Sequence, residues 1–293
     1  MSKIKSDKLL ISSDFYSVQG EGISTGIPSY FIRLGLCNLN CGMSRKFTNE
    51  LFKSKSLEDG EIFKGDLELE GKASWTCDST SQWLWRGEDK DFQYLIDQWK
   101  EQGIYNDILT GDIHLIWTGG EPLLHQIPIY NFFKYWSVIE FANHVNIPLY
   151  NGESIKYRKI NGYNIFNEIE TNGTIYIEDK IWKCLDQINC SPKLSNSGMS
   201  EKQRINPDAI KRIMEHKNYQ FKFVISDEND IKEMIAFRNR FLIPMKNIVC
   251  MPGMDSQDQF HERTQFVMEM AKKYKFRGMS RMHISAWDKT LNV

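Results

Sequence analysis

Short apolar runs alternate with amphipathic helical patterns along most of the chain, and this alternation constrains the fold more than any other feature. Seven runs rich in β-branched and aromatic residues are predicted as strands: Ser29–Leu36, Asp112–Thr118, Asn164–Thr171, Asp186–Ser191, Tyr219–Ser226, Lys246–Met251 and Ser280–Ala286. Helical patterns lie between several of them, at Phe92–Gly103, Asn131–Val145, Pro207–Lys217, Glu228–Phe241 and Gln257–Tyr274. This order is typical of parallel βαβ units, so we expect an α/β fold with one open or closed barrel over residues 1–293.

The composition narrows the class of protein. The chain has 293 residues, of which 41% are hydrophobic, and a formal net charge of −1. These values are typical of a globular protein and provide no broad basic face for nucleic acid. No apolar run approaches the roughly 20 residues of a membrane span, and the N-terminus lacks the apolar core of a secretory signal. We therefore expect a cytoplasmic protein with a small-molecule substrate and no direct contact with nucleic acid or membrane.

The six cysteines are too few for a disulfide scaffold, and we expect them to be reduced. Cys37 and Cys41 form a Cys-x3-Cys motif after the first predicted strand, and Cys77 follows much later. Three such thiolates could bind three irons of a [4Fe–4S] cluster and leave the fourth iron open. A zinc site or unrelated buried thiols are the alternatives, although no histidine or fourth cysteine lies nearby in sequence. The remaining three cysteines are expected to be buried free thiols: Cys184, Cys190 and Cys250.

Two glycine-containing motifs carry further candidate residues. The first, Thr118–Pro122 (TGGEP), ends a predicted strand; its paired glycines would let the backbone approach a ligand, and Glu121 could receive an ammonium group. The second, Tyr16–Gly22 (YSVQGEG), precedes the first predicted strand. Its Gln19 amide and Glu21 carboxylate could read the edge of a heterocycle. Taken alone, either motif could also be a plain turn.

Together and in this order, the motifs resemble the radical S-adenosylmethionine (SAM) enzymes, and within them the 7-carboxy-7-deazaguanine synthase family. The resemblance extends over nearly the whole chain. It rests on FYSVQGEG (15–22), YFIRLGLCNLNC (30–41), CDS (77–79), WTGGEP (117–122), EIETNGT (168–174), NCSPK (189–193), FKFV (221–224), CMPG (250–253) and MHISAWDKTLNV (282–293).

The resemblance implies an incomplete TIM-like (β/α) barrel of the radical SAM type, with the cluster at the C-terminal ends of the strands. It implies conversion of 6-carboxy-5,6,7,8-tetrahydropterin to 7-carboxy-7-deazaguanine with release of ammonia, in queuosine or DNA 7-deazaguanine biosynthesis. SAM would bind the open iron, and one electron would cleave it to methionine and a 5′-deoxyadenosyl radical that removes hydrogen from C6 of the pterin. Mg²⁺ would hold the substrate carboxylate. A homodimer and a flavodoxin- or ferredoxin-type electron donor are also implied.

Position by position, the resemblance assigns three groups of residues. The cluster ligands would be Cys37, Cys41 and Cys77, and Ser79 would bind Mg²⁺. SAM would lie against Gly119, Gly120, Glu121, Thr171, Asn172, Ser191, Pro192 and Lys193. The pterin would be bound by Val18, Gln19, Gly20, Glu21, Arg33, Thr118 and His283, and the planar fork of Arg33 suits its carboxylate.

The cluster loop departs from the family pattern. The usual motif is Cys-x3-Cys-x2-Cys, whereas here 35 residues (42–76) separate Cys41 from Cys77. We expect an inserted segment at about 42–74, which is tolerable because loop-closure entropy grows only slowly with length. Ser79 also replaces the usual threonine. Two alternative functions stay open: an activase that installs a glycyl radical on a partner protein, and a non-catalytic binding module stabilised by a metal centre.

Overall fold

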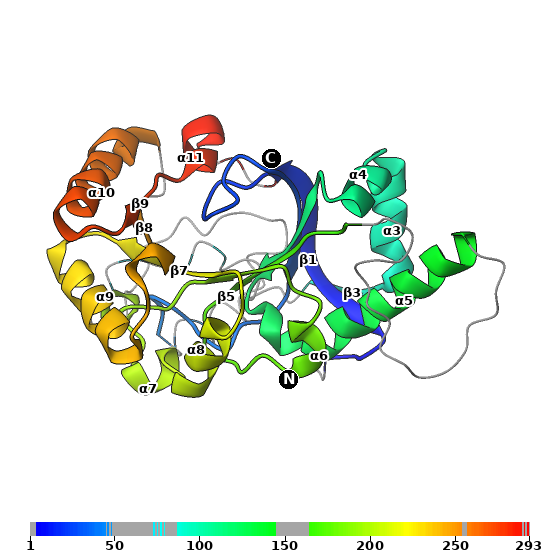
Figure 1. Cartoon of the computed structure of the whole chain (residues 1–293), viewed down its shortest axis with the longest axis horizontal. Helices are drawn as coiled ribbons and strands as arrows, with labels where there is room; N and C mark the ends of the chain where they lie inside the picture. Colours follow the sequence, from blue (N-terminus) through cyan, green and yellow to red (C-terminus); the bar gives the residue numbers. More distant parts are fainter. Residues whose placement is uncertain are drawn as a thin grey trace.

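A computed structural model describes residues 4–44, 46, 48, 73, 75, 77, 79, 87–144, 164–253, 257–288, 290 and 292. Within these ranges the chain forms one nine-stranded sheet in the order β3-β1-β2-β4-β5-β6-β7-β8-β9, with helices on its outer side (Figure 1). The predicted insertion at about 42–74 falls mostly outside the described residues.

Seven strands run parallel and follow one another in chain order. They are β2 (Pro28–Leu34), β4 (His114–Gly119), β5 (Asn167–Thr171), β6 (Gln187–Cys190), β7 (Tyr219–Ile225), β8 (Ile248–Pro252) and β9 (Arg277–Gly278). Two antiparallel strands extend this sheet beyond β2: β1 (Lys8–Val18) pairs with β2, and β3 (Glu88–Asp91) pairs with β1. The strands β3 and β9 form the two edges, so the sheet is an incomplete barrel. The predicted fold class is confirmed.

Most helices lie between successive strands of the sheet. The helices are α3 (Phe92–Glu101), α4 (Tyr105–Thr110), α5 (Gln126–His144), α6 (Asp179–Trp182), α7 (Glu201–Arg204), α8 (Pro207–Met214), α9 (Glu228–Phe241), α10 (Phe260–Tyr274) and α11 (Met282–Trp287). Of these, α7, α8 and α9 begin at side-chain caps. Short 3-10 turns lie at Pro122–His125, Ser195–Ser197, Met245–Asn247 and Gln257–Gln259. At α8, the Asn206 side chain accepts hydrogen bonds from two backbone N–H groups and Pro207 takes the first helical position. In the described part of the chain, no helix is long and apolar enough to cross a membrane.

All five predicted helices are present, but one predicted strand is wrong. The run Ser280–Ala286 was expected to be a strand, whereas Met282–Trp287 is helix α11 and the last strand is the two-residue β9. A short apolar run of this length does not distinguish strand from helix by its periodicity. Two further strands have no counterpart in the prediction. The sequence of β3, EDKD, is entirely charged and carries no apolar pattern.

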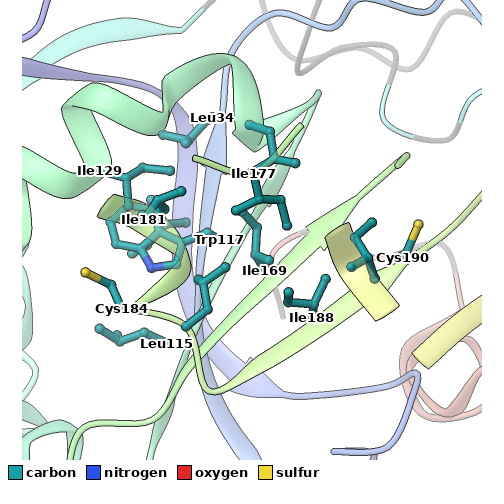
Figure 2. Packing of buried hydrophobic residues seen from close by; sticks show 14 of the residues in the cluster. Leu34, Leu115, Trp117, Ile129, Ile169, Ile177, Ile181, Cys184, Ile188 and Cys190 are labelled. Carbon is teal, nitrogen blue, oxygen red and sulfur yellow. The ribbon is translucent and has the colours of Figure 1, made fainter. Parts of the chain in front are cut away.

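The two faces of the parallel strands differ in chemistry because alternate side chains point to opposite sides. The outward face packs beneath the helices and includes the fully buried Trp117, Ile169 and Ile188 (Figure 2). Burial of each such side chain stabilises the fold by about 1.5–3 kcal/mol. The predicted free thiols Cys184, Cys190 and Cys250 are buried, as expected. The inner face of the same strands carries polar side chains, among them Thr118, Glu170, Asn189 and Lys222.

The paired glycines after β4 allow two stretches of backbone to approach each other. A Cβ atom on Gly120 would overlap the carbonyl oxygen of Leu36, and one on Gly119 would lie 2.5 Å from the backbone of Leu34. The N–H groups of Gly120 and Glu121 donate to the carbonyls of Leu34 and Leu36, at 3.0 and 2.9 Å. The glycines therefore join the end of β4 to the segment that leads from β2 into the Cys-x3-Cys loop.

We predict that Gly120→Ala lowers the free energy of unfolding by about 3 kcal/mol, because the new methyl group meets rigid backbone. The matched control is Gly103→Ala. Gly103 has a φ of 71° but open space around its Cα, so its cost should be limited to about 1–2 kcal/mol of left-handed backbone strain. Urea unfolding of both variants measures the difference. Equal destabilisation by the two substitutions would contradict the close approach.

Candidate active site

The segments that follow four parallel strands contain the candidate cluster and SAM residues. Strand β2 leads into the Cys37 loop, β4 into Gly119–Glu121, β5 into Thr171 and Asn172, and β6 into Ser191–Lys193. In barrels of this type, the C-terminal ends of the strands are where active sites lie. Most candidate pterin residues lie on the inner face of the sheet and in the loop 19–27 between β1 and β2, and His283 lies in α11.

The three candidate cluster cysteines gather in one group of side chains. Cys41 packs with Leu39 and Met199, while Cys37, Trp75 and Cys77 pack against this group. The backbone N–H of Cys77 donates to the carbonyl of Cys41 at 3.2 Å. Cys77 therefore lies beside Cys41, although 35 residues separate the two in sequence.

Two observations fit this group to a bound iron–sulfur cluster. The indole N–H of Trp75 is buried and has no hydrogen-bond partner among the described residues, so a sulfur atom of a cluster would provide the missing acceptor. Burial, with the nearby charge of Glu121, raises the pKa of Cys37 to about 12. Without a metal this thiol stays protonated at neutral pH, and metal coordination is what would ionise it.

A single metal ion and an iron–sulfur cluster need different arrangements of the thiols. Among the described residues, no group of three or more His, Cys, Asp or Glu side chains is arranged to hold one ion. In a [4Fe–4S] cluster each cysteine binds a different iron, so the thiols need not converge on one point. The arrangement of these thiols is therefore compatible with a cluster.

Three hydrogen bonds from two segments of the chain fix the loop from Cys37 to Gly42. The Asn38 side chain donates to the hydroxyl of Thr174 at 2.7 Å and accepts from the side chain of Asn172 at 3.0 Å. The N–H of Gly42 donates to the carbonyl of Ser197 at 2.8 Å. The loop is thus held in place by the segments that follow β5 and β6.

Glu121 is fixed by hydrogen bonds from residues of its own chain. Its side chain is fully buried, and its two oxygens accept hydrogen bonds from the N–H of Leu123, the hydroxyl of Thr171 and the N–H of Asn172, at 2.7–3.0 Å. Burial raises the pKa of this carboxyl group. In this arrangement Glu121 fixes the candidate SAM residues that follow β5. Its own contact with the SAM ammonium group stays a prediction.

The remaining candidate SAM residues lie next to this junction. The N–H of Ser191 donates to the carbonyl of Thr171 at 2.7 Å. Lys193 lies 3.4 Å from the Ser191 hydroxyl, and its ammonium group is 5.8 Å from the ring centre of Trp75. The segment Ser191–Lys193, which includes Pro192, therefore links the end of β5 to the group of cysteines.

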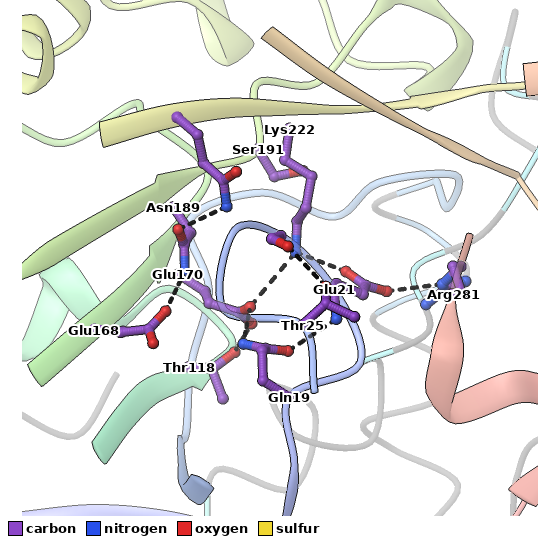
Figure 3. Close-up of polar contacts among 12 residues, drawn as sticks. Gln19, Glu21, Thr25, Thr118, Glu168, Glu170, Asn189, Ser191, Lys222 and Arg281 are labelled. Atoms are coloured by element: carbon purple, nitrogen blue, oxygen red, sulfur yellow. Dashed lines mark hydrogen bonds and ion pairs between the residues drawn. The ribbon is translucent and has the colours of Figure 1, made fainter. Parts of the chain in front are cut away.

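A second cluster of polar side chains lies on the inner face of the sheet (Figure 3). Glu170 accepts hydrogen bonds from the Thr118 hydroxyl at 2.8 Å and from the Gln19 amide at 3.3 Å. The ammonium group of Lys222 lies 3.4 Å from Glu170 and 2.6 Å from Glu21. We call Gln19, Glu21, Thr118, Glu170, Lys222 and Arg281 the acceptor pocket.

Glu21 is the most strongly paired carboxylate of the acceptor pocket. Lys222 contacts one oxygen, Arg281 contacts the other at 2.8 Å, and His283 lies 3.9 Å away. Burial alone would raise the pKa of Glu21, but the positive charges of Lys222 and Arg281 outweigh it and hold the pKa well below its usual value. Glu21 is therefore ionised at neutral pH.

The chain near its C-terminus holds the loop 19–27 in position. The carbonyl of Gly20 accepts from the N–H of Met282 at 3.0 Å, and a Cβ atom on Gly20 would overlap the His283 ring. Val18, the last residue of β1, leads into this loop. The candidate pterin residues from the two ends of the chain are therefore in direct contact.

Arg33 lies on β2, paired in register with Thr118 of β4. Its guanidinium group lies 4.8 Å from the ring centre of Phe15 and donates to the side chain of Asn292 at 2.9 Å. Ser79 is half-buried, but both of its chain neighbours lie outside the described residues. Its proposed contact with Mg²⁺ is therefore not tested here.

Sequence reasoning did not single out three members of the acceptor pocket: Glu170, Lys222 and Arg281. For Glu170 and Lys222, which lie in strands, the sequence itself contains a signal. Glu170 alternates with buried Ile169 in β5, and Lys222 lies between buried Phe221 and Phe223 in β7. A charged residue inside an apolar strand rarely lies in a core without a partner. Arg281 lies in the run that was taken for a strand.

Comparison with known proteins shows similarity over most of the chain to curated 7-carboxy-7-deazaguanine synthases. The protein of Pyrobaculum aerophilum is 25% identical over 274 residues, covering 93% of this chain and 92% of its own length. That of Aquifex aeolicus is 26% identical over 286 residues, covering 95% and 94%. That of Leptospira interrogans is 28% identical over 233 residues, covering 78% and 75%. These relatives confirm the resemblance that the motifs indicate.

One solved structure extends the comparison to the fold. The crystal structure of QueE from Escherichia coli superposes with a TM-score of 0.52 and 20% sequence identity, covering 94% of this chain and 95% of that one. No family model matches the chain. The structural likeness supports the incomplete-barrel fold.

We predict that Glu21→Gln lowers the free energy of unfolding by about 3 kcal/mol at pH 7, because Lys222 and Arg281 lose their buried partner. The pKa of Glu21 is lowered in the folded state, so its stabilisation is complete above about pH 4.5 and is lost as pH falls below that. Below that pH, the difference in unfolding free energy between wild type and variant should narrow by about 1.4 kcal/mol per pH unit. Urea unfolding at a series of pH values measures it. A gap that stays constant from pH 7 to pH 3.5 would rule out the ionised pair.

Proposed function

We propose that this protein is a 7-carboxy-7-deazaguanine synthase, a radical SAM carbon–nitrogen lyase. It would contract 6-carboxy-5,6,7,8-tetrahydropterin to 7-carboxy-7-deazaguanine with release of ammonia. One observation carries the proposal: strand β5 and its loop join a group of three cysteines to a pocket rich in hydrogen-bond acceptors. Glu170 belongs to the pocket, and Asn172 binds the cysteine loop through Asn38. The similarity to curated synthases over most of the chain supports it.

In this proposal Cys37, Cys41 and Cys77 hold a [4Fe–4S] cluster, which supplies the single electron for reductive cleavage of SAM when both are bound. The residues that would hold SAM lie in the segments that end or follow β4, β5 and β6. Glu121 keeps Thr171 and Asn172 in place, since it binds both. Lys193 contributes positive charge beside the cysteines.

The acceptor pocket matches the chemistry of a pterin. The aminopyrimidinone edge of a pterin presents N–H donors. Carboxylate and amide oxygens accept hydrogen bonds from such groups. Gln19, Glu21 and Glu170 provide such oxygens. Arg33, on the same inner face, provides a planar fork for the substrate carboxylate. Binding at both ends would fix the orientation of the ring between them.

Further parts of the proposal rest on the resemblance. They are Mg²⁺ at Ser79, a flavodoxin- or ferredoxin-type electron donor, a homodimer, a cytoplasmic location, and no direct contact with nucleic acid. The chain would be one radical SAM domain over 1–293, with the segment at about 42–74 inserted in the cluster loop. The product would enter queuosine or DNA 7-deazaguanine biosynthesis.

We predict that anaerobically reconstituted protein, given SAM, Mg²⁺, a reductant and 6-carboxytetrahydropterin, forms 7-carboxy-7-deazaguanine, detected by mass spectrometry. Cys77→Ala should abolish both this product and 5′-deoxyadenosine, because one cluster ligand is lost. The matched control is Cys184→Ala, which removes a buried thiol of the hydrophobic core and should retain product formation.

Two outcomes would contradict the proposal in different ways. Formation of 5′-deoxyadenosine without the deazaguanine would keep the radical chemistry but point to another substrate, such as the partner protein of a glycyl-radical activase. Neither compound, despite an intact cluster, would indicate a binding module without catalysis.

A further inference from the structure

Lys222 is a buried charge in an otherwise apolar strand. It is only 4% exposed, and its neighbours Phe221 and Phe223 face the core. A buried ammonium group is costly unless it is paired and hydrogen-bonded. Lys222 is paired twice, with Glu21 at 2.6 Å and with Glu170 at 3.4 Å (Figure 3).

The two carboxylates come from distant parts of the chain. Glu21 lies 201 positions before Lys222, in the loop 19–27, and Glu170 lies 52 positions before it, in β5. Arg281 pairs with Glu21, whereas Lys222 contacts both carboxylates. One side chain therefore sets both the spacing and the charge of the two acceptors.

The charges in the acceptor pocket balance. Glu21 and Glu170 carry two negative charges, and Lys222 and Arg281 carry two positive charges. Burial favours a neutral Lys222, but the two carboxylates outweigh that effect and raise its pKa above the usual value. Without Lys222, two carboxylates would share one cation in a site with little water, and one of them would take up a proton.

The protonation state matters for recognition. An ionised carboxylate only accepts hydrogen bonds, whereas a protonated one also donates. If a protonated carboxyl group pointed its O–H at the N–H groups of a heterocycle, two donors would face each other and no hydrogen bond would form. The side chain that keeps both carboxylates ionised therefore determines which edge of a substrate the pocket can bind.

We infer that Lys222 is a positioning residue that holds Glu21 and Glu170 as a pair of charged acceptors, and that it thereby determines affinity for a substrate with an N–H donor edge. The recognition part of this inference rests on the proposed function; the charge part does not. Lys222 acts through the two carboxylates and needs no contact with the reacting atoms.

The first test measures binding through kinetics. Lys222→Met should raise KM for the pterin at least tenfold at pH 7 and change kcat by less than about threefold, since the cluster and SAM residues are untouched. KM of this variant should fall toward the wild-type value by pH 9, as the protonated carboxyl ionises. Lys222→Arg, which keeps the charge, should recover most of the affinity. Lys273→Met removes an exposed lysine paired with Glu228 and should leave KM unchanged.

The groups that face the pair define the pH range of this test. Glu21 faces Lys222 from β7 and Arg281 and His283 from the C-terminal segment, while Glu170 faces Lys222, Gln19 and Thr118. Wild type and Lys222→Met both keep His283. A difference between their KM values that changes from pH 7 to pH 9 therefore reports on the carboxylates.

A second test does not depend on turnover. Infrared spectra of the reconstituted protein at pH 7 should show one more protonated carboxyl group in Lys222→Met than in wild type. This extra signal should be absent from one of two double variants, which combine Lys222→Met with either Glu21→Gln or Glu170→Gln. If Lys222→Met does not fold, as judged by circular dichroism, Lys222→Gln takes its place in both tests.

The outcomes separate the inference from the proposed function. No product from wild type, with the extra carboxyl signal present in the variant, would overturn the proposed function and keep the charge role of Lys222. Active wild type, with an unchanged KM in Lys222→Met and no new carboxyl signal, would overturn the inference. An equal rise in KM in Lys222→Arg and Lys222→Met would also overturn the inference, because loss of the positive charge would then not be the cause.

Discussion

The buried ion pair between Glu21 and Lys222 joins the loop that follows the first strand to a strand far along the sheet. The incomplete barrel has two edges, β3 and β9, and this ion pair links the loop after β1 to β7 across its inner face. Arg281 and the Gly20–Met282 hydrogen bond add the C-terminal segment to the same junction. A desolvated pair of this kind is costly to break, and it gives the pocket a defined charge as well as a defined shape.

Three consecutive residues of β5 and its loop connect the parts of the site. Glu170 faces the acceptor pocket, Thr171 binds Glu121 after β4, and Asn172 binds Asn38 in the cysteine loop. A displacement at one of these residues would be transmitted to the other two, since they share a backbone. The candidate substrate and cofactor regions are therefore built on one rigid element, which favours precise placement of two reactants.

The sequence analysis predicted the α/β class and most elements because helices and parallel strands have distinct hydrophobic periods. Local chemistry was harder to predict. The close approach of Gly120 to the backbone of Leu36 joins two segments that are far apart in sequence, and the GGEP motif alone does not predict it. Glu121 accepts hydrogen bonds from Leu123, Thr171 and Asn172, and its contact with an ammonium group stays a prediction. The role of Lys222 depends on Glu21 and Glu170, and no local pattern relates residues so far apart in the chain.

The central claim is that the group of cysteines and the acceptor pocket form one active site. The most direct test is anaerobic turnover with 6-carboxytetrahydropterin that carries deuterium at C6, followed by mass spectrometry of SAM and 5′-deoxyadenosine. A single site predicts deuterium in 5′-deoxyadenosine or in recovered SAM, together with labelled or unlabelled 7-carboxy-7-deazaguanine. Entirely unlabelled 5′-deoxyadenosine and SAM, formed at the same rate with and without the pterin, would contradict it.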